Sequence, residues 1–419
     1  MEKASVLIIG SEIVEGDRRD GNGQLISRIL TQKGLQVTSI KAVPDDEEQI
    51  LSSITHRLND QDLIIISGGL GGTHDDITKP ALKSLLNADD FFDKEVYSNI
   101  ERILNKRGVK ITEGHRQIAF LPKGATPLPN NIGLCPGVML EKENTTILAL
   151  PGVPFEAKHI LEHHLEKVIP AKKRTAYEEI NLKVAGLRES EISEKLSEVI
   201  TNLPQSYKIS LLPSLSEVAI RITATGENRE SLIKGLKALE QDIREVLGAA
   251  IYGTGNEQLS SVLGRHLNHR SKNLAVAESC TGGHLAHQIT SISGSSQYFK
   301  GGVVAYSNNL KQSLLNVSRE TLNNHGAVSE PVVKEMVKGA TENLGTDCAI
   351  ATSGIAGPGG GTDEKPVGTI WIAAGDKSHI ETQLLQLSYD RMSNIQYTSV
   401  ASLNLLRLWL SKGSLNKTA

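Results

Sequence analysis

Short apolar runs alternate with amphipathic stretches along the first part of the chain. The runs are rich in Val, Ile and Leu, end at Gly or polar residues, and predict buried strands at Ser5–Ile9, Leu35–Val43, Asp62–Ser67 and Thr146–Leu150. Apolar positions at helical spacing predict helices at Gln24–Gln32, Glu47–Leu58 and Pro154–Val168. This alternation of strands and helices predicts a parallel sheet with helices on both faces.

The pattern changes after a short basic linker, Pro170–Thr175. The next stretch has a strand–helix–strand–strand–helix–strand order, which predicts a small open α+β sandwich. Its strands are expected at 177–184, 207–212, 217–224 and 249–252, and its helices at 189–200 and 229–247.

A third region follows the turn Gly253–Gly255 and again alternates strands and helices. It opens with a helix at Leu259–Leu267 and closes with a helix at Met392–Ser411. We therefore predict an α/β protein of three domains, at residues 1–170, 176–253 and 257–415.

Composition narrows the class of protein. The 45 basic and 48 acidic residues nearly balance, and aromatic residues make up 4% of the chain, so neither charge nor stacking favours nucleic-acid binding. The three cysteines form no C-x-x-C pair, which argues against a disulfide framework or a structural zinc site. Because no apolar run approaches membrane-spanning length, we expect a cytoplasmic protein without membrane contact.

The third region carries a candidate nucleophile. Ser279 lies in the segment Ala277–Gly283, between a predicted strand at Leu274–Ala277 and a predicted helix at Gly283–Thr290. A hydroxyl at such a junction is exposed, and the free N–H groups of the helix start lie beside it. This arrangement suits a nucleophile next to an oxyanion or phosphate site.

Other chemistry-bearing segments also follow predicted strands in this region. Tyr306–Asn308 follows one strand, with Lys311 about one helical turn further on, and the glycine-rich loop Ser353–Gly361 follows another. Strand ends of an α/β sheet meet at one edge, where such folds bind ligands. We therefore hypothesise that Ser279 attacks, Lys311 removes its proton, and Tyr306 orients or relays that proton.

Several alternatives remain open from the residues alone. His284, His287 and His325 are rival bases, and Cys280 is a rival nucleophile. Ser279 could instead be a plain helix cap, and Lys311 a solvated surface lysine.

Taken together, these segments resemble the C-terminal domain of the CinA family of competence/damage-inducible proteins. The matching segments, in the same order, are Ala277–Gly283, Val304–Asn308, Gly326–Pro331, Ser353–Pro358 and Lys365–Thr369. The resemblance implies a metal-independent amidase that hydrolyses nicotinamide mononucleotide to nicotinic acid mononucleotide and ammonia. It implies catalytic roles for Ser279, Lys311 and Tyr306. The residues expected to bind substrate are Thr281, Gly282, Gly283, Asn308, Ser353, Gly354, Gly357 and Arg391, with Arg391 our candidate for the phosphate.

The first region carries glycines and carboxylates at its strand ends. Gly68–Thr78 follows one strand, Val43–Asp46 and Gly10–Glu12 follow two others, and the rigid loop Pro151–Glu156 precedes a helix. Glycines let a backbone approach a phosphate, and grouped carboxylates suit a hard divalent cation. The alternative is that Asp75 and Asp76 merely cap the helix that starts near Thr78.

This region resembles the molybdopterin-binding-like N-terminal domain of the same family, which implies hydrolysis of ADP-ribose with a divalent cation. The implied nucleotide-binding residues are Gly68, Gly69, Gly71, Thr73, Gly152 and Glu156, and the implied ligands of Mg²⁺, Mn²⁺ or Co²⁺ are Asp76, Asp46 and Glu12. Gly72 stands where the family usually has proline, which loosens the loop. The middle region resembles the family's linker domain and carries no evident chemistry.

The residues and the resemblance together predict an enzyme of pyridine-nucleotide recycling with two activities, both on small molecules. We expect the protein to be a homodimer. Two other classes stay open: a non-catalytic nucleotide-sensing protein linked to competence, and a molybdopterin-handling enzyme.

Overall fold

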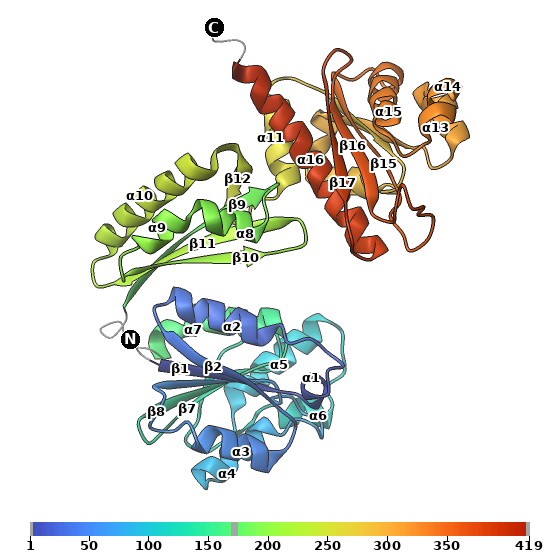
Figure 1. Cartoon of the computed structure of the whole chain (residues 1–419). Coiled ribbons are helices and arrows are strands. Elements are labelled where there is room, and N and C mark those ends of the chain that lie inside the picture. The colour runs from blue at the N-terminus through green and yellow to red at the C-terminus, as the bar shows by residue number, and fades with distance from the viewer. Residues whose placement is uncertain (1–2, 169–174, 416–419) are drawn as a thin grey trace. The chain divides into compact units, whose positions relative to one another are not determined.

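The computed structural model describes residues 3–168 and 175–415, and the chain folds into two compact units (Figure 1). One unit comprises residues 1–178 with 225–232, and the other comprises residues 179–224 with 233–419. Most of the predicted linker, Pro170–Arg174, lies outside the described residues.

The first unit is built on a six-stranded sheet with strand order β2-β1-β3-β8-β7-β6. Its strands are β1 (Lys3–Ile9), β2 (Gln36–Val43), β3 (Leu63–Ser67), β6 (Thr126–Leu128), β7 (Gly137–Lys142) and β8 (Thr145–Leu150). The pairings β1–β2, β1–β3 and β3–β8 are parallel, as the sequence predicts. The pairings β8–β7 and β7–β6 are antiparallel, so the sheet is mixed at this edge.

Helices cover both faces of this sheet, and the central strand β3 is buried along its whole length (Figure 1). Alternate residues of β3 point to opposite cores, with Ile64 and Ile66 on one side and Leu63 and Ile65 on the other. The helices are α1 (Ser11–Val14), α2 (Asn22–Gln32), α3 (Glu47–Thr55), α4 (Thr78–Leu86), α5 (Lys94–Lys106), α6 (Glu113–Gln117) and α7 (Pro154–Val168), and a small ribbon pairs β4 (Asp90–Phe92) with β5 (Phe120–Pro122).

The second unit contains two sheets. A four-stranded sheet has the order β10-β11-β9-β12 and includes β9 (Ala176–Ala185), β10 (Tyr207–Pro213), β11 (Glu217–Gly226) and β12 (Ile251–Thr254). Its helices are α8 (Glu189–Lys195), α9 (Ser197–Thr201) and α10 (Arg229–Leu247). This is the predicted strand–helix–strand–strand–helix–strand order.

The five-stranded sheet of this unit has the order β14-β13-β15-β16-β17. Its strands are β13 (Leu274–Glu278), β14 (Phe299–Val304), β15 (Cys348–Gly354), β16 (Thr369–Gly375) and β17 (Ile380–Gln386). The first three strands in spatial order are parallel, and the pairings β15–β16 and β16–β17 are antiparallel. The helices are α11 (Leu259–His269), α12 (His284–Thr290), α13 (Asn308–Leu315), α14 (Arg319–His325), α15 (Glu330–Asn343) and α16 (Arg391–Leu415).

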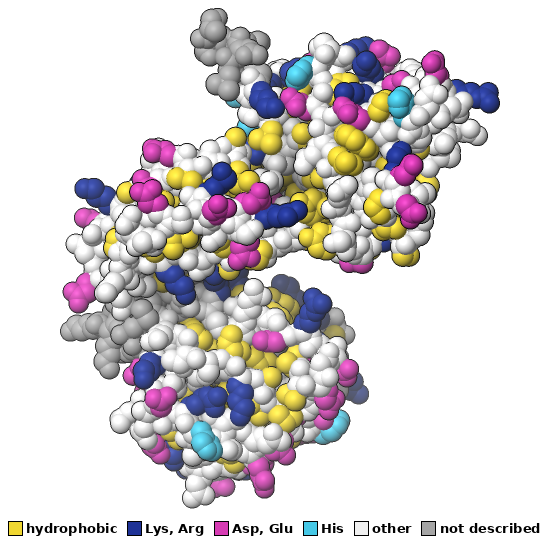
Figure 2. Space-filling model, viewed as in Figure 1, with side chains coloured by type: hydrophobic (Ala, Val, Ile, Leu, Met, Phe, Trp, Pro, Cys, Tyr) yellow, Lys and Arg dark blue, Asp and Glu magenta, His cyan; other side chains and the backbone are white. Residues whose placement is uncertain are grey.

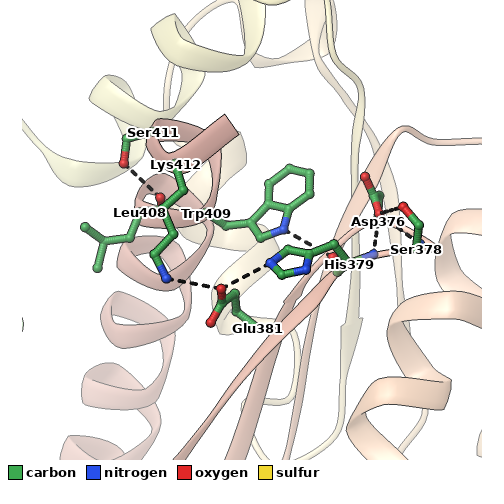
Figure 3. Close-up of polar contacts among 8 residues, drawn as sticks. All are labelled: Asp376, Ser378, His379, Glu381, Leu408, Trp409, Ser411 and Lys412. Carbon is green, nitrogen blue, oxygen red and sulfur yellow. Dashed lines mark hydrogen bonds and ion pairs between the residues drawn. The ribbon is translucent and has the colours of Figure 1, made fainter. Parts of the chain in front are cut away.

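The long helix α16 is fastened to both sheets of the second unit. Near its end, the indole N–H of Trp409 donates to the His379 carbonyl in the β16–β17 turn, and Lys412 pairs with Glu381 (Figure 3). The buried guanidinium of Arg407 donates to the Ala249 carbonyl, just before β12. The C-terminal part of the helix is therefore held to both sheets.

On the face shown in Figure 2, basic and acidic side chains are interspersed over the described surface of each unit. In the part of the chain that the structure describes, no helix combines the length and apolar character needed to cross a membrane.

Candidate functional site

The parallel strands β13, β14 and β15 bring three predicted segments to one sheet edge. Ser279 directly follows β13, Tyr306 follows β14, and Ser353 lies near the end of β15. Because these strands are parallel neighbours, their carboxyl ends lie side by side, as predicted for a ligand site.

Lys311 is the buried centre of this site. Its side chain extends from α13, the residue is 2% exposed, and Nζ lies 2.9 Å from the Ser279 Oγ and 2.8 Å from the Ala305 carbonyl oxygen. Among the described residues, no carboxylate forms an ion pair with it. Burial lowers the pKa of Lys311, and the nearby Cys280 offsets this only in part. Burial therefore makes the charged form of this amine less favourable than it is in water.

Ser279 is held in a fixed loop. Its N–H donates to the Thr352 carbonyl at 3.0 Å, and the Thr281 and Thr352 hydroxyls lie 2.8 Å apart. Gly282 and Gly283 have φ of +60° and +99°, conformations that favour glycine, so they let the chain turn sharply into α12. Thr281, Gly282 and Gly283, predicted as substrate-binding residues, thus shape the loop that presents Ser279.

The structure corrects one expectation about this loop. We expected free N–H groups at the start of α12, but the Glu278 carboxylate accepts hydrogen bonds from the N–H groups of Gly283, Leu285 and Ala286. The fully buried Glu278 carboxylate thus occupies the anion-binding end of the helix. These N–H groups at the start of α12 are therefore not free to bind an external anion. The sequence analysis missed this role, although a carboxylate just before a loop–helix junction is a recognisable signal.

Arg391 and Tyr306 form the outer part of the site. The Arg391 guanidinium donates to the Tyr306 hydroxyl at 2.9 Å and to the Gly357 carbonyl at 2.6 Å. Tyr306 is 60% exposed, so its ring lies at the mouth of the site. The predicted loop residue Gly357 thus positions Arg391 through its backbone.

The remaining predicted substrate-binding residues are Ser353, Gly354 and Asn308. The Ser353 hydroxyl donates to the Ala327 carbonyl. A Cβ at Gly354 would lie 2.4 Å from the Ile370 side chain, so this glycine allows the close approach of β16. Asn308 begins α13, one turn before Lys311. Ser353 and Gly354 therefore support the site through packing and hydrogen bonding.

The rival groups are not placed for catalysis with Ser279. The imidazole of His284 lies 2.9 Å from the Ser399 hydroxyl, and no hydrogen bond joins Ser279 to the described His284, His287 or His325 side chains. Burial raises the pKa of the Cys280 thiol to about 12, which disfavours the thiolate that a cysteine nucleophile needs.

The first unit holds a separate cavity of about 680 Å³ at the carboxyl ends of its parallel strands. Of the predicted residues, Glu12, Gly68, Gly69, Gly71, Asp76, Gly152 and Glu156 line it, whereas Thr73 and Asp46 do not. Asn22, which the sequence analysis did not single out, also lines it and donates through Nδ2 to the Ser67 hydroxyl and the Gly152 carbonyl. Arg18, Arg19 and Arg107 add positive charge to the lining.

The predicted metal ligands do not assemble into a metal centre. The Asp76 carboxylate accepts hydrogen bonds from the N–H groups of Gly71 and Thr73, and Asp46 caps α3 by accepting from the Gln49 N–H. Across the described residues, no group of three or more His, Cys, Asp or Glu side chains could hold a metal ion. Two carboxylates of the set Asp76, Asp46 and Glu12 are thus engaged in stabilising their own loops, and the role of this set as metal ligands stays a prediction.

Glu156 behaves differently from these carboxylates. Burial raises its pKa, although a hydrogen bond from the Asn130 amide acts in the opposite direction. Asn130 also accepts from the Gly133 N–H, so Glu156 is tied to the neighbouring loop.

Comparison with known proteins identifies three family domains along the chain. Residues 256–410 match the CinA C-terminal domain, residues 5–171 the probable molybdopterin binding domain, and residues 180–253 the damage-inducible protein CinA KH domain. These matches agree with the N-terminal, middle and C-terminal folds predicted from the sequence.

Relatives match this chain over nearly its whole length. A CinA-like protein of Cytophaga hutchinsonii is 36% identical over 98% of this chain and 98% of its own length. A CinA-like protein of Dictyoglomus thermophilum is 33% identical over 97% of this chain and 98% of its own length. A solved CinA superfamily structure from Klebsiella pneumoniae is 38% identical and covers 37% of this chain and 96% of its own, with a TM-score of 0.36. On the near-complete match to these relatives, the chain belongs to the CinA family.

Proposed function

We propose that the site around Ser279 and Lys311 is a serine amidase that converts nicotinamide mononucleotide to nicotinic acid mononucleotide and ammonia. The observation that carries the proposal is the 2.9 Å contact between the Lys311 Nζ and the Ser279 Oγ in a buried setting. A serine hydroxyl is a weak nucleophile at neutral pH and needs such a base. The substrate itself comes from the family resemblance.

The reaction can be written with these two residues alone. Neutral Lys311 takes the Ser279 proton as Oγ bonds to the carboxamide carbon, which gives a tetrahedral intermediate. The protonated Lys311 returns that proton to the departing nitrogen, the C–N bond breaks, and ammonia leaves an ester on Ser279. Water then attacks the ester, Lys311 takes a proton from the water and returns it to the Ser279 Oγ, and the carboxylic acid product leaves.

Arg391 supplies the positive charge that the substrate's phosphate requires. Its guanidinium is fixed by the Gly357 carbonyl and the Tyr306 hydroxyl, and it still has donors available. Because Glu278 occupies the start of α12, Arg391 is the better phosphate partner on this side of the site.

The test is ammonia release from nicotinamide mononucleotide by the full chain with EDTA present. We expect release by the wild type and its loss in Ser279→Ala. Ser291→Ala is the matched control and should behave as wild type, because the exposed Ser291 hydroxyl, at the C-terminal end of α12, donates to the Gln288 carbonyl. Absence of release from the wild type would overturn the proposal.

For the first unit, we propose binding of a nucleoside diphosphate ligand, with ADP-ribose hydrolysis as the activity that the family resemblance implies. The supporting observation is the cavity of about 680 Å³, lined by backbone glycines and by Arg18, Arg19 and Arg107. Calorimetry with ADP-ribose tests the binding, and AMP release with Mg²⁺, Mn²⁺ or Co²⁺ tests the hydrolysis. No heat of binding at millimolar ligand would contradict it.

A further inference from the structure

A second cavity lies in the unit formed by residues 179–224 and 233–419, apart from the Ser279 site. Its volume is about 460 Å³, within the range of roughly 300–1,000 Å³ that is usual for small-molecule sites. Three segments line it, 186–189 after β9, 213–218 in the β10–β11 turn and 386–389 after β17, together with Tyr397. It therefore lies between the four-stranded and five-stranded sheets, and domain junctions of this kind commonly bind ligands.

One wall of this cavity is aromatic. The rings of Tyr389 and Tyr397 stack with centroids 6.2 Å apart and planes at 28°. Tyr389 is 48% exposed, although its ring is held by Tyr397. A ring that is fixed and accessible offers a stacking surface for a planar heterocycle.

The other walls are polar and carry both charges. Arg188 is exposed and forms no ion pair with any residue that the structure describes, so it is available to an anion. Glu189 lines the cavity beside it and can accept a hydrogen bond from an amino group. The second carboxylate of the lining, Glu217, faces the Tyr252 hydroxyl. Ser216 and Ser388 add hydroxyls suited to a sugar.

This combination matches one class of small molecule. A nucleoside monophosphate carries a flat base with hydrogen-bond donors, a sugar and a single phosphate. Tyr389 offers a stacking surface for the base and Glu189 an acceptor for its donors, the serine hydroxyls offer partners for the sugar, and Arg188 offers a cation for the phosphate.

The cavity is connected to the Ser279 site through a short chain of buried contacts. The side chain of Asn394 is fully buried and donates both to the Tyr389 carbonyl and to the Ala356 carbonyl. The next residue after Ala356 is Gly357, whose carbonyl accepts from Arg391. A ligand that moves Tyr389 therefore acts on the same loop that positions Arg391.

We propose that this cavity is an effector site for a nucleoside monophosphate and that its occupation changes the position of Arg391. The binding part stands on the cavity itself, whereas the effect on catalysis rests on the proposed amidase function.

The binding test is photolabelling of the full chain with 8-azidoadenosine monophosphate, with the labelled peptides mapped by mass spectrometry. We expect label within 186–189 or 386–389, reduced at least tenfold in Arg188→Ala. The control is Arg319→Ala, a surface arginine of α14 outside the cavity lining, which should leave the label unchanged. Label confined to the first unit, or equal labelling of Arg188→Ala and wild type, would overturn the site.

The coupling test measures ammonia release from nicotinamide mononucleotide with and without saturating adenosine monophosphate. We expect the KM to change at least threefold in the wild type and not in Arg188→Ala, since the signal passes to Arg391. An unchanged KM in a wild type that is labelled in the cavity would overturn the coupling. Because labelling does not require turnover, an inactive amidase would leave the binding result readable by itself.

Discussion

The Lys311 Nζ lies 2.9 Å from the Ser279 Oγ, although the two residues are 32 positions apart in the chain. The contact exists because β13 and β14 are parallel neighbours, so the loop after one strand meets the helix after the other. Lys311 is buried there without a carboxylate partner among the described residues, which is a costly position for a charged amine and a suitable one for a neutral base.

The first prediction concerns Lys311 as the base. Lys311→Met should lower the kcat of ammonia release by about 10²–10⁴-fold, the usual contribution of general-base catalysis. Lys311→Arg should not rescue activity, because a guanidinium stays protonated. Lys334→Met removes a surface lysine paired with Glu330 and serves as control. A Lys311→Met enzyme with half the wild-type rate would rule out this role.

The second prediction concerns pH. Burial lowers the pKa of Lys311 below the ordinary lysine value of 10.5, and the neutral amine, which is the active form, predominates above that lowered pKa. The kcat/KM should therefore rise with pH and level off below pH 10.5. A pH–rate profile of the wild type checks this, and a rate that falls as pH rises through this range would contradict it.

The third prediction separates the two candidate nucleophiles. Cys280→Ala should retain most of the amidase activity, because burial holds the pKa of the thiol at about 12 and the Lys311 amine contacts Ser279 instead. Iodoacetamide should likewise inactivate the wild type slowly. Complete loss of ammonia release in a folded Cys280→Ala protein would move the nucleophile to Cys280.

The fourth prediction concerns Arg391 and the substrate's phosphate. Arg391→Ala should raise the KM for nicotinamide mononucleotide by about 10- to 150-fold, as expected for loss of a charged hydrogen bond of about 1.5–3 kcal/mol. Arg391→Lys should recover part of this, since a lysine keeps the charge but loses the fork geometry. Steady-state kinetics of the two variants measure kcat and KM separately. A change in kcat with an unchanged KM would show that Arg391 does not bind the phosphate.

The fifth prediction concerns Gly72, in the loop that follows β3. A Cβ at this position would lie 1.9 Å from the Gly114 carbonyl oxygen, so the loop has closed tightly against α6. Gly72→Ala should destabilise the first unit by about 1–3 kcal/mol. Urea unfolding measures this, with Gly21→Ala as control because nothing lies within 4 Å of its added Cβ. Equal midpoints for the two variants would contradict the packing argument.

Much of the fold was accessible from local patterns. The apolar run at β3 and the amphipathic pattern of α2 predict their elements to within a residue or two, because each pattern depends only on near neighbours. The stretch between β3 and β8 shows little periodicity that predicts its elements. There, short strands such as β4 and β5 carry too few residues for a periodicity to emerge.

The candidate site, like the fold, is only partly predictable from the sequence. Strand-end placement of Ser279, Tyr306 and the glycine-rich loop followed from the order of strands and helices, since carboxyl ends of parallel strands share an edge. Which base meets Ser279 did not follow, because lysine and three histidines all lay within reach of that edge.

The sequence by itself determined the three α/β folds, the family resemblance and the set of residues that could do chemistry. Only the tertiary structure decided which of them meet: Lys311 contacts Ser279, His284 contacts Ser399, and Glu278 occupies the start of α12. It also decided that Asp46 and Asp76 stabilise their own loops. The physical reason is the separation in sequence over which each kind of interaction acts. Helix and strand formation depend on residues a few positions apart, whereas a hydrogen bond between distant side chains depends on strand order, register and packing.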